Sequence, residues 1–128
     1  MTIVGDGEQS RDFIFVTDVA SAFLSSSNSK IKGYNVFNVG NGRPMTINYL
    51  AKLLNPVGIV NIPDRPGEPR QTFANISKIK EILGWEPSIK FEDGVKIMIK
   101  NINYWKDAPL WDKSSISVET KDWFKYVK

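Results

Sequence analysis

Cysteine and histidine, two side chains central to metal and acid–base chemistry, are absent from this chain of 128 residues. Without cysteine, the chain has neither a disulfide nor a thiolate metal site. Without histidine, it lacks the commonest metal ligand and the only side chain whose ordinary pKa suits acid–base catalysis near neutrality. No stretch approaches the ~18 consecutive apolar residues of a membrane span. We therefore expect no metal site and no membrane-spanning helix.

The excess of charge of either sign is small, because seventeen basic and fourteen acidic residues leave a net charge of +3. The ten lysines after residue 71 are interleaved with eight acidic residues, so there is no basic stripe of the kind that nucleic acids require. The length suits one domain or a piece of a larger one. The chain begins with the strand-like TIV rather than a signal peptide, which makes a cytoplasmic location the default expectation.

Arginine is scarce, and its placement is informative. Of the seventeen basic residues only four are arginine, namely Arg11, Arg43, Arg65 and Arg70, and all lie in loops rich in glycine and proline. Lysine is a flexible point charge, whereas the planar arginine fork binds phosphate or carboxylate through two hydrogen bonds. The pattern predicts an anion site, with phosphate as the favoured ligand, built from loops that are far apart in sequence.

Hydrophobic periodicity predicts an α/β or α+β fold with short strands and four to five helices. Strands are expected at residues 2–4, 13–16, 34–39 and 59–62, with 2–16 forming a hairpin-like pair. Helices are expected at residues 19–26, 47–54, 77–83, 92–106 and 117–127. Thr17 and Thr46 are the expected N-caps, and Gly84 is expected to end its helix. The side chains expected in the core include Val19, Ala22, Phe23, Trp85, Val95, Met98, Ile99, Ile102, Trp105 and Trp123.

Glycine patterns and tyrosine–lysine spacing give little support for catalysis or cofactor binding. GDGEQS is followed by the strand-like FIFV, and VFNVGNGRPM has Met45 at the third glycine position, so a tight strand-to-helix turn is favoured over a dinucleotide cradle. Tyr49 precedes Lys52 by three positions, whereas the short-chain dehydrogenase pair needs four. We expect no catalytic residue in this chain.

Two of the arginines have alternative interpretations as ordinary salt bridges. Arg11 is adjacent to Asp12, and a local pair between them is as plausible as a ligand contact. Arg65 and Glu68 flank Pro66-Gly67, where they could form an i, i+3 pair in a surface turn or bind phosphate and a ligand hydroxyl, respectively. The residues alone leave these alternatives open.

Four motifs, in order, resemble those of the extended short-chain dehydrogenases/reductases, which include the nucleotide-sugar epimerases and dehydratases. They are GDGEQSRDFIFVTDVASAFL, YNVFNVGNGRPMTINYLAKLL, RPGEPR and ANISKIKEILGWEPSIKFEDGV. By this resemblance Arg11 would contact the diphosphate of a nucleotide sugar, with Gln9 nearby. Arg65 would grip the same diphosphate from the other side, Glu68 would bind ribose hydroxyls, and Arg70 is a weaker candidate.

The resemblance is to the C-terminal, substrate-binding part of these enzymes. Residues 1–106 would form that part, 18–40 would return to the Rossmann sheet of a full-length enzyme, and 107–128 would be a variable tail. The cofactor loop and the Tyr-x-x-x-Lys of the family lie in the Rossmann domain, so NAD is implied for the full-length enzyme and no cofactor for this chain. Val4 stands where the family often has an aromatic that packs on the base.

Without a Rossmann neighbour, the strand at 34–39 would present a sticky apolar edge. We expect it to pair within the chain, to pair with a second copy in a homo-oligomer, or to be covered by the tail. The expected function is binding of a nucleoside-diphosphate hexose as part of an NAD-dependent epimerase or dehydratase, without turnover by this chain alone. The alternative is a truncated or stand-alone interaction or oligomerisation module that binds no ligand.

Overall fold

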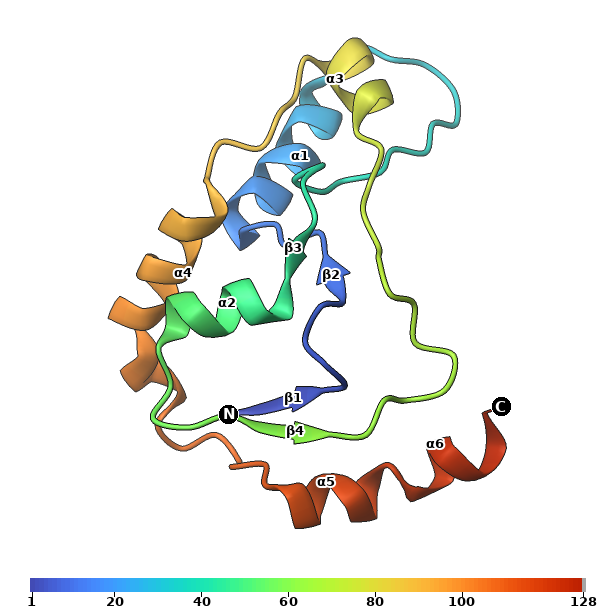
Figure 1. Cartoon of the computed structure of the whole chain (residues 1–128). Helices are drawn as coiled ribbons and strands as arrows, with labels where there is room; N and C mark the ends of the chain where they lie inside the picture. Colours follow the sequence, from blue (N-terminus) through green and yellow to red (C-terminus); the bar gives the residue numbers. More distant parts are fainter. Residues whose placement is uncertain (128) are drawn as a thin grey trace.

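The computed structural model describes residues 1–127, in which four short strands and the first helices are followed by a helical C-terminal half (Figure 1). In order they are β1 (Thr2–Val4), β2 (Ser10–Arg11), α1 (Val16–Asn28), β3 (Met45–Thr46), α2 (Ile47–Leu54), β4 (Val60–Ile62), α3 (Ser77–Leu83), α4 (Phe91–Lys100), a 3-10 helix η1 (Ile102–Trp105), α5 (Lys113–Glu119) and α6 (Lys121–Tyr126). The predicted α/β class is confirmed. The described residues form six α-helices rather than four to five, because the expected C-terminal helix is interrupted at Thr120.

The strands pair with distant parts of the chain rather than with their neighbours. β1 pairs in parallel with β4, so that Val4 lies beside Ile62, while β2 pairs antiparallel with β3. The predicted hairpin-like pair over 2–16 is therefore wrong, as is the strand at 13–16. The turn after β1, which includes Gly5 at a φ of 59°, leads the chain away towards β2 instead of reversing it (Figure 1).

Helix α1 begins earlier than predicted and without a local cap. Its N-cap is Phe15, which makes no side-chain cap hydrogen bond, so the prediction of Thr17 was wrong. Asp18, in the first turn, is buried and accepts hydrogen bonds from the backbone N–H groups of Ser88 (3.1 Å) and Ile89 (3.0 Å) and from the Ser88 hydroxyl (2.7 Å). The start of α1 is thus held by hydrogen bonds to the segment before α4 instead of by a side-chain N-cap within the helix.

Helices α2 and α3 follow their local signals. The hydroxyl of Thr46 accepts a hydrogen bond from the backbone N–H of Tyr49 at 3.1 Å, which confirms the predicted N-cap of α2. Helix α3 ends at Gly84, which adopts a left-handed φ of 63° as predicted. Capping needs only residues within one turn, and for that reason the sequence predicts these ends well.

The buried core lies between α1, α3 and the segment that follows α3. Ala22, Ile79 and Trp85 form its centre, and the indole N–H of Trp85 donates to the hydroxyl of Ser21 at 2.8 Å. The partly buried side chains around it are those of Ile14, Phe37, Val39, Ile76 and Leu83. Trp85 is thus in the core as predicted.

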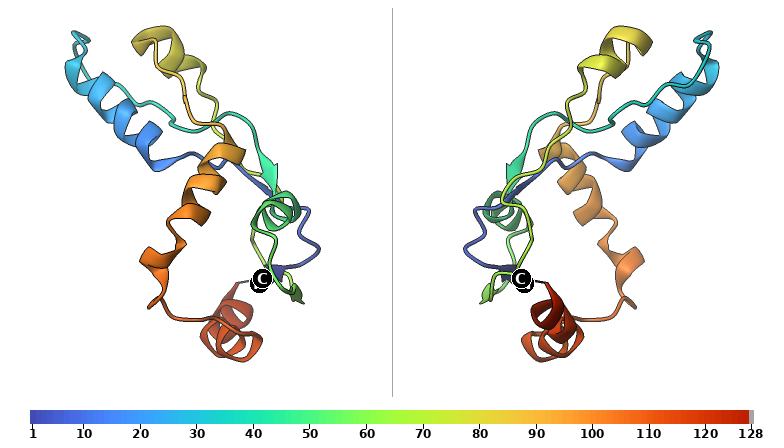
Figure 2. Two further views of the ribbon diagram at one scale, coloured as in Figure 1. Left: turned by 90° about the vertical axis from the view of Figure 1, so that its left-hand side faces the viewer. Right: turned by 90° about the vertical axis from the view of Figure 1, so that its right-hand side faces the viewer.

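Much of the predicted core is exposed. Of the side chains expected to be buried by α4 and its extension, only Val95 is buried, and Trp105 is about half exposed. Phe23 is 73% exposed. The chain exposes 9612 Å² in total, whereas a compact monomer of its mass would expose roughly 6,900 Å². Figure 2 shows α1 and α4 extending away from each other, so the described residues leave their outer faces uncovered.

Residues 34–39 do not form the predicted strand. Phe37 and Val39 point to the core while Tyr34 and Val36 are exposed, an alternation that suits an extended segment. The described residues offer it no ladder partner, and its contacts are with α3 instead: the Lys78 ammonium donates to the carbonyl of Val36 at 2.9 Å. Pairing with a second copy stays a prediction.

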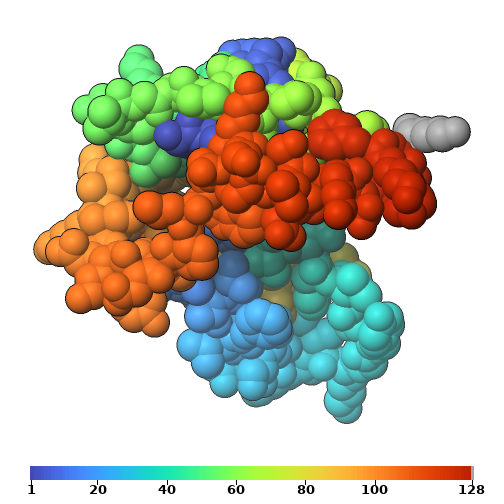
Figure 3. Space-filling view, turned by 90° about the horizontal axis from the view of Figure 1, so that it is seen from below, coloured from blue at the N-terminus to red at the C-terminus, as the bar shows by residue number. Residues whose placement is uncertain are grey.

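The C-terminal helices α5 and α6 lie along β4 at the lower edge of the molecule, as Figures 1 and 3 show. A pocket between them and the end of β4 is lined by Ile62, Pro63 and Arg65 on one side and by Ile116 and Phe124 on the other. Among residues 1–127, every helix is too short or too polar to cross a bilayer.

Candidate functional site

Glu68 joins Arg11 and Arg65 into one cluster. Its Oε1 accepts a hydrogen bond from Nη2 of Arg11 at 3.2 Å, and its Oε2 accepts one from Nε of Arg65 at 3.0 Å. All three side chains are partly buried, with 24%, 30% and 26% of Arg11, Arg65 and Glu68 exposed. The two guanidinium groups therefore converge on a single carboxylate, and the cluster carries one net positive charge.

The backbone brings these distant residues together. β2 carries Arg11, and the 63–71 loop is fixed along β2 because the N–H of Ser10 donates to the carbonyl of Arg70 (2.8 Å) and the N–H of Thr72 donates to that of Ser10 (3.2 Å). Gly67 adopts a left-handed φ of 75°, which allows the tight turn that brings the Glu68 carboxylate to the Arg65 guanidinium. The cluster is thus built from a strand and a loop that are far apart in sequence, and the prediction that Arg11 lies in a loop is wrong.

Of the two alternatives for Arg11, the local pair with Asp12 does not form. The carboxylate of Asp12 accepts hydrogen bonds from the backbone N–H groups of Asn41 (2.8 Å), Gly42 (3.0 Å) and Ala74 (2.9 Å). Asp12 therefore holds two loops in place. The i, i+3 pair of Arg65 and Glu68 does form, but it is part of the larger cluster.

A small pocket of about 110 Å³ opens beside the cluster. It is lined by Val4, Gln9, Asp64, Arg65, Glu68, Pro69 and Arg70. Gln9 is buried: its amide donates to the carbonyl of Val4 at 2.8 Å, and its Oε1 has no hydrogen-bond partner among the described residues. Four of the five predicted site residues thus surround one pocket, and Arg11 contacts it through Glu68.

Arg70 is already neutralised. Its two terminal nitrogens donate to the two carboxylate oxygens of Asp6 at 2.9 and 3.1 Å. The hydrogen bond from Arg70, together with one from the backbone of Glu8, lowers the pKa of Asp6 to about 2. Arg70 is therefore less suited than Arg65 to an incoming anion. Arg43 is exposed and forms no ion pair among residues 1–127.

Trp123, in α6, is a residue of the site that sequence reasoning missed, because it was expected in the core. The residue is 42% exposed, and its ring centroid lies 5.6 Å from the guanidinium carbon of Arg65. Its indole N–H donates to the carbonyl of Pro66 at 2.7 Å. No local signal in the tail points to this contact, because the partner lies 57 positions away.

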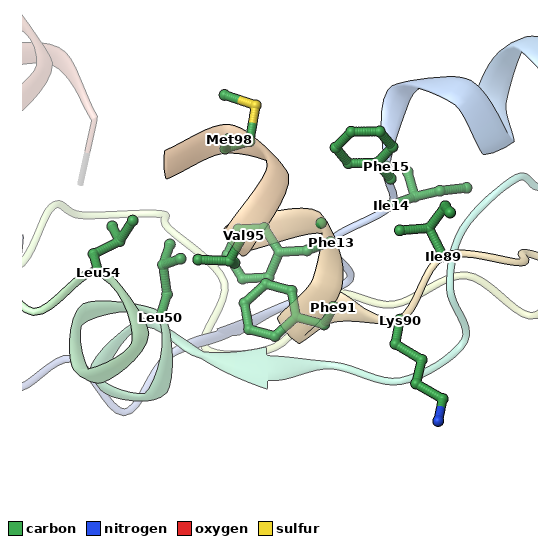
Figure 4. A pocket seen from close by; sticks show the side chains of 11 residues that line it. Phe13, Ile14, Phe15, Leu50, Leu54, Ile89, Lys90, Phe91, Val95 and Met98 are labelled. Carbon is green, nitrogen blue, oxygen red and sulfur yellow. The ribbon is translucent and has the colours of Figure 1, made fainter. Parts of the chain in front are cut away.

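Another pocket among the described residues is strongly apolar and has no convergent polar side chains for a nucleotide. It has a volume of about 290 Å³ between α2, α4 and residues 13–15. Figure 4 shows Phe13, Leu50, Phe91 and Val95 pointing towards one another, while the Lys90 amino group points away. A lining without convergent donors or acceptors gives a polar ligand no orientation.

The turn between residues 39 and 43 does not fit a dinucleotide cofactor. A phosphate there would need free backbone N–H groups, but Asp12 accepts hydrogen bonds from two of them. A Cβ at Gly40 would meet Asp12 Oδ2 at 2.5 Å, so this glycine makes room for a carboxylate rather than a phosphate. The carboxylate would also repel an anion.

The hydroxyl of Tyr49 donates to Glu92 at 2.8 Å. This hydrogen bond raises the pKa of Tyr49, the reverse of what a catalytic tyrosinate needs.

Residues 1–98 match the model of the family described as GDP-mannose 4,6 dehydratase. The chain is 34% identical over 113 residues to the UDP-glucuronate 4-epimerase of Thermodesulfobacterium geofontis, covering 82% of this chain and 33% of that protein. It is 34% identical over 106 residues to UDP-glucuronic acid decarboxylase 2 of Arabidopsis thaliana, covering 79% and 23%. The chain thus spans a third or less of these relatives' length.

Solved structures of nucleotide-sugar epimerases also match this chain over about a third of their own length. The UDP-glucose 4-epimerase of Thermotoga maritima, solved with UDP-glucose, superposes with a TM-score of 0.73 at 39% identity, covering 81% of this chain and 35% of that one. The UDP-glucuronic acid 4-epimerase of Bacillus cereus, solved with UDP-glucuronic acid and NAD, has a TM-score of 0.72 at 28% identity, covering 80% and 35%. Both likenesses extend over most of the described fold.

Proposed function

We propose that this chain, which belongs to the family of NAD-dependent nucleotide-sugar epimerases and dehydratases, binds a nucleoside-diphosphate sugar and holds it by its diphosphate. Arg11 and Arg65 are the proposed anion ligands. The single observation that carries the proposal is their convergence on Glu68, because two guanidinium groups meet there at the distances used for binding an oxyanion.

The arrangement leaves donors for a ligand. Each guanidinium has five N–H donors, and Glu68 engages only one nitrogen of Arg11 and two of Arg65, the second at 3.5 Å. The cluster keeps one positive charge after Glu68 is counted. A diphosphate can therefore bind to the remaining N–H groups while Glu68 keeps both forks oriented and faces the ribose hydroxyls.

The ligands found in related solved structures support the choice of ligand. One was solved with UDP-glucose and another with UDP-glucuronic acid. The role proposed for this chain is to bind the diphosphate and to orient the sugar. Binding energy at the diphosphate positions the sugar for a reaction that residues outside this chain carry out. The NAD-dependent step is assigned to residues outside this chain, because the 39–43 turn does not fit the cofactor.

Titration with UDP-glucose and UDP-glucuronic acid tests the proposal. Arg65→Ala should weaken binding at least about tenfold, since a charge-assisted hydrogen bond contributes about 1.5–3 kcal/mol. Arg65→Lys should also weaken it, because an ammonium cannot replace the fork. Arg43→Ala is the matched control, since it removes the same charge from an exposed loop. Equal effects of Arg43→Ala and Arg65→Ala, or no saturable binding at millimolar ligand, would contradict the proposal.

The exposed surface favours a second role, as an interaction module. The chain exposes 9612 Å², well above the roughly 6,900 Å² of a compact monomer, and Val16, Phe23 and Leu24 line the open face of α1. Patches of this kind mark contacts with another folded surface. Sedimentation equilibrium over a hundredfold concentration range tests this role: a strictly monomeric chain that remains soluble would argue against it.

A further inference from the structure

The C-terminal helix α6 lies against the loop that carries Arg65 (Figure 1). Trp123 and Val127 are four positions apart, and the N–H of Val127 donates to the carbonyl of Trp123 at 2.9 Å, so one helical turn places both side chains on the same face. The indole N–H of Trp123 donates to the carbonyl of Pro66 at 2.7 Å. This face of α6 lies beyond the family match at residues 1–98, and it meets a loop that lies within that match.

Gly67 makes room for the contact between α6 and the loop. A Cβ at this position would lie 3.0 Å from Cγ1 of Val127, which is closer than side chains normally pack, so a larger residue would push the helix end away. The preceding residue, Pro66, has its φ fixed by its ring. The loop that α6 meets is therefore stiff at one position and open to close approach at the next.

Trp123 holds the charge of Arg65 without using its hydrogen-bond donors. The guanidinium carbon lies over the indole ring, 5.6 Å from the ring centroid, which is within the range of a cation–π contact. Indole has one N–H donor and no hydrogen-bond acceptor, and here the donor goes to Pro66. Trp123 therefore restrains Arg65 and leaves its N–H groups to Glu68 and to a ligand.

The two arginines of the cluster are restrained by different parts of the chain. Nη1 of Arg11 donates to the carbonyl of Ser10 at 2.8 Å, a partner in its own strand. Arg65 donates to Glu68 from Nε at 3.0 Å and from Nη2 at 3.5 Å, and among residues 1–127 its Nη1 has no hydrogen-bond partner. Its further restraint comes from Trp123. A side chain that is already held loses less rotamer freedom when a ligand binds, so this contact favours binding.

We propose that Trp123 is a positioning residue for the diphosphate, which it affects by fixing the guanidinium of Arg65; the inference rests on the proposed function. Arg65 contacts the ligand, and Trp123 contacts Arg65. A helix beyond the family match thus becomes part of the binding site and determines how tightly the arginine loop holds an anion.

Binding of inorganic pyrophosphate, which carries the phosphates alone, tests the inference by calorimetry. Trp123→Leu should weaken binding about threefold to tenfold, because the cation–π restraint on Arg65 is lost. Trp123→Phe should recover most of that loss, since it keeps a ring for the cation. Tyr126→Leu is the matched control: it removes an exposed aromatic side chain from the same helix and should change the affinity less than about twofold.

A double-mutant cycle determines whether Trp123 acts through Arg65. In the Arg65→Ala chain, Trp123→Leu should change the pyrophosphate affinity less than about twofold, because the restrained group is gone. NMR relaxation of the Arg65 Nε–H should show larger motion in Trp123→Leu than in the wild-type or Tyr126→Leu chain. A Trp123→Leu chain with an altered circular dichroism spectrum is replaced by Trp123→Met, which fills the volume but offers no ring.

The outcomes separate the two proposals. If pyrophosphate binding requires Arg65 but Trp123→Leu leaves the affinity unchanged or raises it, the inference is overturned and the diphosphate site stands. Equal losses with and without Arg65 would also overturn it, since Trp123 would then act on the fold in general. If the wild-type chain binds neither pyrophosphate nor UDP-glucose, both proposals are overturned.

Discussion

Glu68 accepts a hydrogen bond at 3.2 Å from Arg11, a residue 57 positions earlier in the chain. The same carboxylate also binds Arg65, so one negative charge orients two guanidinium groups. Two roles are proposed for Glu68: it orients the two guanidinium groups, and it binds ribose hydroxyls. A substitution that removes its charge distinguishes these roles.

The Glu68→Gln chain should bind inorganic pyrophosphate about threefold to tenfold more tightly, because the cluster gains a net positive charge and a pair at ~4 Å in water contributes about 1 kcal/mol. Its affinity for UDP-glucose should rise less, since the amide is a poorer acceptor for ribose. Calorimetry at two salt concentrations measures both, and Glu86→Gln, which removes a carboxylate paired with Lys80 instead, is the control. Unchanged pyrophosphate affinity would mean that phosphate binds away from Glu68.

Asp18 should make the stability of the fold depend on acid pH. Burial alone would raise its pKa, but the hydrogen bonds from Ser88 and Ile89 outweigh burial and lower it. Because the folded pKa is below the unfolded one, this contribution is present above the unfolded value of about 3.9 and is lost as pH falls through the folded pKa.

Asp18→Asn should therefore lower the free energy of unfolding by roughly 2 kcal/mol at pH 7, since the amide cannot accept all three hydrogen bonds. The difference between the two chains should shrink below about pH 4, where the wild-type carboxyl becomes protonated. Urea unfolding at a series of pH values measures it. A difference that stays constant down to pH 2 would exclude the carboxylate as its source.

Trp123→Leu should release the Arg65 loop. The variant loses the hydrogen bond to Pro66 and the stacking on Arg65, which together contribute about 1–2 kcal/mol. Amide hydrogen exchange of residues 64–68 should become faster by roughly fivefold to thirtyfold. Trp111→Leu, at an exposed tryptophan of the same tail, is the control. Equal exchange in both variants would show that α6 does not hold the loop.

The Asp6–Arg70 pair should be visible in a carboxyl titration. Asp6 should titrate at about 2 in the wild-type chain, and Arg70→Ala should move its pKa up towards the ordinary value of 3.8. NMR of the side-chain carboxyl carbon follows both. A pKa near 3.8 in the wild-type chain would show that the two side chains do not pair in solution.

The sequence predicted the local features of this fold, but it did not predict which strands and side chains pair over long distances in the chain. The N-cap at Thr46 and the end of α3 at Gly84 follow from residues within one turn. The pairing of β1 with β4 and the connection of Asp18 to Ser88 do not, because each joins segments more than fifty positions apart. The error over Trp105 had another source: helical periodicity marks an apolar face but does not show what covers it.

By itself, the sequence determined the chemistry available to this chain: no histidine or cysteine, and arginine at only four positions. It also singled out Arg11, Arg65 and Glu68, which the structure brings into one cluster. Only the tertiary structure decided how they meet: that Arg11 pairs with Glu68 rather than Asp12, that Asp6 neutralises Arg70, and that Trp123 stacks on Arg65. The physical reason is the distance in sequence over which each interaction acts. Caps and turns depend on neighbouring residues, whereas the partner of a charge or of a strand depends on how the whole chain packs.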